Sequence, residues 1–177
     1  MPERRTIQRA RRDRRQGKSP STQAGEFVRE QIHHIREGRH GARSAKQAIA
    51  IGLSQARRAG VDLPPPAKGK ASARTRRSAK LAYDAGHGHP HRTVRPASHR
   101  RRSRAIERAL RRESRSAASH TALSRHARAA AKKRTAAERS RSARAASRTK
   151  GPAARRAAAR KAAQTRSHSR SRSRARA

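Results

Sequence analysis

The amino-acid sequence predicts a chain that is mostly disordered and otherwise all-α, with one small helical hairpin. Hydrophobic residues make up only 31% of the 177 residues, and the chain holds one Phe, one Tyr and no Trp. There are 50 Lys and Arg against 10 Asp and Glu, which gives a formal net charge of +40. So little apolar surface cannot offset chain entropy and charge repulsion over most of this length. We therefore expect the free protein to fold only locally.

Composition divides the chain into zones. Residues 1–24 are interpreted as a basic disordered arm that ends in a loop rich in Ser, Pro and Gly. Residues 25–63 are interpreted as the helical hairpin, because there the charges nearly balance. Residues 64–91 form a linker of Pro, Gly and His with a possible helix at 72–85. Residues 92–177 form a cationic tail rich in Arg, Ala and Ser, with 29 Lys and Arg among them.

The tail also contains strong helix formers. They concentrate at residues 103–113, 117–146 and 154–163. Alanine and arginine both favour helix, so these segments could form isolated helices once phosphates neutralise the arginines.

The first helix of the hairpin is predicted at residues 26–37. Val28, Ile32 and Ile35 lie at i, i+4 and i+7, which places them on one face of a helix. Gly38 follows and is a typical helix stop.

The second helix is predicted at residues 44–59. Ser44 and Gln47 have the spacing of a capping box, and Gly60 followed by prolines ends the helix. The expected core is Phe27, Val28, Ile32, Ile35, Ile49 and Leu53. Two helices bury too little area to be stable alone. We therefore expect a third helix, a bound polyanion or a second copy, and so a possible homodimer through the hairpin.

The charge predicts a nucleic-acid partner. A pI near 12 is typical of nucleic-acid-binding proteins. Duplex DNA is favoured over single strands because aromatic residues for base stacking are nearly absent. Local charge density indicates which arginines contact phosphates. They are Arg11, Arg12, Arg14, Arg15, Arg57, Arg58, Arg100, Arg101, Arg102, Arg170, Arg172 and Arg174.

Other classes of function receive little support. His87, His89 and His91, with Asp84 nearby, could hold a divalent metal, but a polar linker is the simpler interpretation. His33 and His34 fit side-chain pairing along a helix with acidic residues four positions away. The chain shows no catalytic motif, so we expect no enzyme, no cofactor, no small-molecule substrate and no resident metal. The sequence contains no apolar run as long as a membrane-spanning helix requires, so we expect no membrane partner.

Residues 25–66 carry a resemblance to a known group of proteins. The strings GEFVREQIHHIREGRHGARS and QAIAIGLSQARRAG, followed by three prolines, resemble those of small, basic, uncharacterised bacterial proteins that are loosely labelled as plasmid-stabilisation or DNA-binding proteins. The tail is similar in composition to linker-histone tails and to bacterial histone-like proteins. The resemblance implies a bacterial protein and assigns no functional residues.

These observations together predict a nucleoid-associated, histone-like protein of the bacterial cytoplasm. It would bind and compact duplex DNA without sequence specificity, by neutralising phosphates through its Arg-rich arms. Two alternatives stay open. One is an RNA-binding protein, and the other is a protein-interaction module of a plasmid-maintenance system whose arms only localise it.

Overall fold

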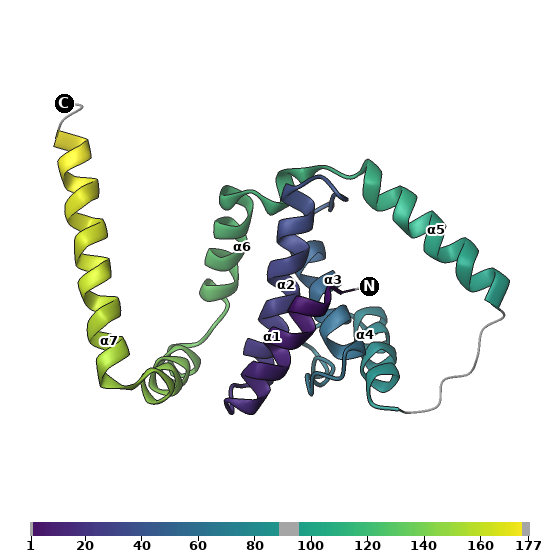
Figure 1. Ribbon diagram of the computed structural model, residues 1–177, viewed down its shortest axis with the longest axis horizontal. Coiled ribbons are helices and arrows are strands. Elements are labelled where there is room, and N and C mark those ends of the chain that lie inside the picture. Colours follow the sequence, from purple (N-terminus) through teal and green to yellow (C-terminus); the bar gives the residue numbers. More distant parts are fainter. Residues whose placement is uncertain (1, 89–95, 175–177) are drawn as a thin grey trace. The chain divides into compact units, whose positions relative to one another are not determined.

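A computed structural model describes residues 2–88 and 96–174. Within these ranges every regular element of secondary structure is a helix (Figure 1). The expectation of a mostly disordered chain is therefore wrong, and the fold is all-α. The helices are α1 (Arg4–Arg15), α2 (Pro20–Arg36), α3 (Ala45–Arg58), α4 (Ala73–Gly86), α5 (Pro96–Arg112), the 3₁₀ turn η1 (Arg115–Ala118), α6 (His120–Lys132) and α7 (Ala136–Arg174).

The chain divides into two compact units, residues 1–127 and residues 128–177. In the first unit, α2 packs on α3, α1 packs on α2, and α4 packs on α3. The predicted hairpin is thus the centre of a larger helical core. The segment expected to be a disordered arm forms α1 and the first turns of α2 instead.

The core of the first unit consists of two clusters. In the first, Phe27 of α2 packs with Ala10 of α1, Ala24, Ala56 and Val61, and partly buried Ile7, Leu53 and Leu63 cover them. In the second, Ile35 packs with Ala42, Ala48 and the two alanines of η1, Ala117 and Ala118. The core therefore draws on residues at both ends of this unit, far outside the hairpin.

Helices α2 and α3 approach closely at Gly52. A Cβ atom at this position would lie 2.6 Å from Val28 Cα and 2.8 Å from Val28 N. Only a residue without a side chain allows this distance between the two backbones. Small residues, Ala45, Ala48, Gly52 and Ala56, consequently form the buried face of α3.

This close approach corrects the expected core. Phe27 and Ile35 are fully buried, as predicted. Val28, Ile32, Ile49 and Leu53 are only half-buried. Because glycine and alanine occupy the space between the helices, these larger side chains lie at the edges of the contact.

Helix α4 is fixed to the end of α3. Ser72 caps it by accepting a hydrogen bond from the backbone N–H of Thr75 (3.2 Å), and the predicted helix at 72–85 is confirmed. The Tyr83 hydroxyl donates to Asp62 Oδ1 (2.7 Å) in the loop after α3. At the end of α4, Gly86 lies directly against the carbonyl of Arg57, where a Cβ atom has no room.

The loop between α2 and α3 is fixed by the last turn of α5 and by the segment that follows it. The backbone N–H of Gly41 donates to the carbonyl of Leu110 (2.8 Å), and that of Ala42 donates to the carbonyl of Ser114 (3.1 Å). Arg36 Nε donates to the carbonyl of Ala118 (2.9 Å). These bonds bring η1 onto the core.

The helices of the second unit, unlike those of the first, have no buried core among their described side chains. Gly151, with φ of 64°, and Pro152 divide α7 into two helical stretches. None of the residues whose side chains are described in this unit is buried. Its helices therefore rest on local hydrogen bonds and on the helix propensity of alanine and arginine.

The close contact at Gly52 predicts opposite effects for two glycine-to-alanine substitutions. Gly52→Ala should lower the free energy of unfolding by about 1–3 kcal/mol, because the added methyl group forces α2 and α3 apart. Gly25→Ala, in α2, should raise it by about 0.4–1 kcal/mol, since nothing lies within 4 Å of that position. Urea denaturation followed by circular dichroism measures both, and a Gly52→Ala variant at least as stable as the parent would contradict the contact.

Candidate nucleic-acid interface

Helix α1 has a buried face and a cationic face. Thr6, Ala10 and Asp13, at i, i+4 and i+7, are buried against the core. Most of the remaining positions are exposed, and the arginines among them are Arg4, Arg5, Arg11, Arg12, Arg14 and Arg15. We call this set the α1 arginine face. It spans about 16 Å at 1.5 Å of rise per residue, comparable to about five phosphate steps along one DNA strand.

Two acidic residues near α1, Asp13 and Glu26, are turned inward. Buried Asp13 accepts a hydrogen bond from Lys18 Nζ (2.6 Å). Glu26, also buried, accepts one from Arg9 Nε (2.7 Å) and pairs with Arg29 (3.1 Å). These two carboxylates pair with Arg9, Lys18 and Arg29, and so they do not neutralise the α1 arginine face.

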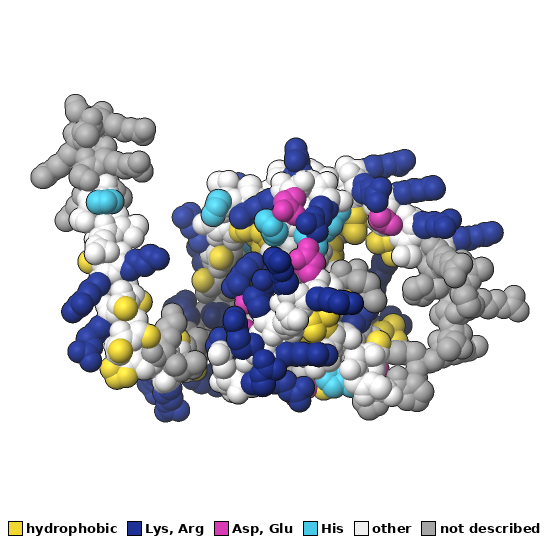
Figure 2. All heavy atoms as spheres, viewed as in Figure 1, with side chains coloured by type: hydrophobic (Ala, Val, Ile, Leu, Met, Phe, Trp, Pro, Cys, Tyr) yellow, Lys and Arg dark blue, Asp and Glu magenta, His cyan; other side chains and the backbone are white. Residues whose placement is uncertain are grey.

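The C-terminal half of α1 is the most cationic part of this face. Within the part of the chain that the structure describes, no acidic side chain pairs with Arg11, Arg12, Arg14 or Arg15. Figure 2 shows the side of the molecule on which α1 lies. Many Lys and Arg side chains cover this side, with few acidic side chains between them. The arrangement suits an extended polyanion better than a small ligand.

Arg57 and Arg58 have different environments, although both were predicted to contact phosphates. Arg57 is buried, and its guanidinium donates to the carbonyls of Leu63 (2.9 Å) and Pro64 (3.3 Å). Burial lowers the pKa of this guanidinium below its ordinary value. Arg57 is therefore not placed to contact phosphates, because its donors hold the loop after α3. Arg58 is exposed.

The other predicted arginines lie on α5 and α7. Arg100, Arg101 and Arg102 are in α5, where Arg101 and Arg102 are exposed. Arg170, Arg172 and Arg174 are in the last turns of α7. The side chains of Arg100 and of these last arginines lie outside the described part of the structure, so only their helical backbone is assigned.

The histidines expected as a possible metal site are only partly described. The ring of His87 stacks on Tyr83 at a centroid distance of 3.9 Å, and its Nδ1 lies 2.8 Å from the Tyr83 carbonyl oxygen. His89 and His91 lie outside the described residues. His87 is thus already engaged with α4.

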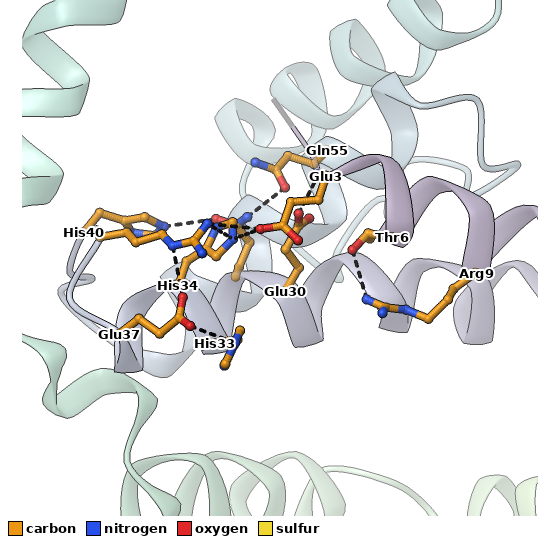
Figure 3. A network of polar contacts seen from close by, with 11 residues as sticks. Glu3, Thr6, Arg9, Glu30, His33, His34, Glu37, His40 and Gln55 are labelled. Atoms are coloured by element: carbon orange, nitrogen blue, oxygen red, sulfur yellow. Dashed lines mark hydrogen bonds and ion pairs between the residues drawn. The ribbon is translucent and has the colours of Figure 1, made fainter.

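A different cluster of metal-binding residue types lies between α1 and α2 (Figure 3). His33 pairs with Glu37 (3.0 Å), as the helical spacing predicts. His34 instead turns to Glu3, with Nε2 3.1 Å from Glu3 Oε1. Hydrogen bonds from His34 and Arg39 hold the pKa of Glu3 below its ordinary value. Sequence reasoning missed this contact, since Glu3 was assigned to a disordered arm.

The N-terminal part of the chain is similar to a known protein family. Residues 3–68 match the model of a family described as a family of unknown function (DUF6496). No curated protein and no solved structure matches the chain. The matched segment contains α1, α2, α3 and the loop that Arg57 holds. Among the described residues, no helix combines the length and the hydropathy of a membrane-spanning segment.

The difference between the two neighbouring arginines can be measured as stability. Arg57→Met should lower the free energy of unfolding by about 1–3 kcal/mol, because two loop carbonyls lose a charged donor. The matched control, Arg58→Met, should change it by no more than about 0.5 kcal/mol, as is usual for exposed positions. Equal losses in the two variants would show that the bonds from Arg57 do not hold the loop.

Proposed function

We propose that this protein binds duplex DNA without sequence specificity and compacts it. The observation that supports this most directly is the α1 arginine face, where exposed arginines on a folded helix form no ion pair with any acidic side chain of the described residues. Arginine side chains in such rows contact phosphates, which fixes a protein on the duplex and reads no base sequence.

Compaction needs more than one DNA contact per chain. The first unit offers the α1 arginine face and the exposed arginines of α5. The second unit exposes further cations along α7, including Arg141, Arg144 and Arg155. Because each unit is cationic by itself, one chain can hold two segments of DNA.

The aromatic residues support duplex DNA over single strands. The sequence contains one Phe, one Tyr and no Trp. Phe27 is fully buried, and Tyr83 is occupied by His87 and Asp62. Neither ring is available as a platform on which unpaired bases could stack.

The salt dependence of binding tests this function on the full-length chain. Arg11, Arg12, Arg14 and Arg15 are replaced together by Gln, and affinity for a random-sequence duplex is measured over a range of salt concentrations. The slope of log K against log salt should become shallower by up to about 3.6, which is four phosphate contacts at about 0.9 each. Light scattering with long DNA should show compaction by the parent chain.

A control variant also removes four positive charges, but from positions outside α1. It carries Gln at the exposed positions Lys46, Lys68, Lys70 and Arg74. We expect a smaller change in slope than for the α1 variant, because these residues are scattered over several elements. An equal change would mean that binding follows total charge and not α1. Tighter binding to duplex RNA of the same length would favour the RNA-binding alternative.

A further inference from the structure

Three side chains of metal-ligating type meet where α1 begins beside α2. Glu3, Glu30 and His34 each offer one ligand atom, and these atoms lie within 4.8 Å of one another. Figure 3 shows them turned toward a common point from the two helices. Glu30 and His34 are one helical turn apart on α2, and Glu3 is the residue before α1.

Glu30 has a carboxylate oxygen that is both buried and without a partner. The residue is 5% exposed, and its Oε1 accepts a hydrogen bond from the backbone N–H of Glu3 (2.6 Å). Its Oε2 is buried and accepts no hydrogen bond from any described residue. A buried acceptor without a donor costs about 1–3 kcal/mol, and more when it is charged. Such an atom is satisfied if a cation binds beside it.

His34 has two neighbours that make opposite demands. Its Nε2 lies 3.1 Å from Glu3 Oε1 and 3.1 Å from Arg39 Nη1. The carboxylate requires a proton on Nε2, whereas the guanidinium requires a lone pair there. No single protonation state of Nε2 satisfies both. A metal ion between His34 and Glu3 removes the conflict, because imidazole nitrogen and carboxylate oxygen then both act as lone-pair donors.

The Glu3 side chain is already directed to this point. As the N-cap residue of α1 it makes no side-chain capping bond within the described structure, and its carboxylate instead contacts His34 and Arg39. Arg39 Nη1 lies 3.0 Å from Glu3 Oε1. A cationic group thus occupies the space beside two of the three ligand atoms.

We propose that Glu3, Glu30 and His34 bind a divalent transition-metal ion, with Zn²⁺ as the best fit. One imidazole and two carboxylates are ligands that Zn²⁺ accepts in tetrahedral sites whose fourth position holds water. Zinc-to-ligand distances of about 2.0–2.1 Å place the ligand atoms about 3.3 Å apart. The Nε2 to Oε1 distance is close to this value, and the Arg39 side chain, which is 54% exposed, can swing into solvent.

The bound ion would join the start of α1 to α2. Metal ligation would then hold the helix that carries the α1 arginine face. The metal site does not depend on whether the protein binds DNA, since it rests on contacts at the opposite end of α1 from Arg14 and Arg15.

Zinc titration of the full-length chain tests the site, with binding followed by calorimetry and unfolding by circular dichroism. The parent should bind one more zinc ion per chain than Glu30→Gln or His34→Asn does. Zinc should raise the melting temperature of the parent and of neither variant, whereas Mg²⁺ at the same concentration should not. Glu30→Gln keeps the size of the side chain and the acceptor for the Glu3 N–H, so it tests ligation without removing packing.

Two further variants sharpen the result. His33→Asn is the matched control, because His33 makes a similar contact with a carboxylate but lies on the exposed side of α2. It should keep the parent stoichiometry and melting shift. Arg39→Gln removes the competing cation and should tighten binding several-fold. Equal stoichiometry and melting shifts in the parent, Glu30→Gln and His34→Asn would overturn the site. Unchanged affinity in Arg39→Gln would overturn the displacement of the guanidinium.

Discussion

The close contact of α2 and α3 at Gly52 determines how this chain folds. With backbone atoms of Val28 against Gly52, the space between the helices holds alanine and glycine and needs few large side chains. Dense packing of small residues gives dispersion contacts in place of the large hydrophobic residues that the sequence lacks. A composition with 31% hydrophobic residues can form a core under this condition.

Polar side chains also enter the interior of the first unit. Gln31 Nε2 donates to Gln55 Oε1 across the two helices (2.9 Å), and Gln23 Nε2 donates to the carbonyl of Lys18 (2.8 Å). Gln31 and Gln23 are long enough to reach hydrogen-bond partners from their buried positions. Buried polar groups with partners cost little and fix the register of the helices. The core is consequently held by shape and hydrogen bonding as much as by apolar area.

Sequence reasoning could predict elements whose signals are local. Helix α3 has its capping residue, Ser44, and its stop, Gly60, in the sequence itself, and both are confirmed. Helix α1 gave no such signal, because its buried face is made of Thr6, Ala10 and Asp13 and contains few apolar groups. Its burial depends on partners in α2 that are distant in sequence. Arg57 was misassigned for a related reason, since local charge density cannot distinguish it from Arg58.

The Glu3–Glu30–His34 cluster was also beyond prediction, because hydrogen bonding across 27 residues brings Glu3 to Glu30. Its composition is unusual for this chain. With 50 Lys and Arg available, a buried carboxylate oxygen would easily be paired with a side-chain cation. Asp13 and Glu26 follow that rule. Glu30 Oε2 does not among the described residues, although Arg39 reaches the neighbouring Glu3. A shortage of cationic side chains cannot explain this, so the geometry of the cluster must be the cause.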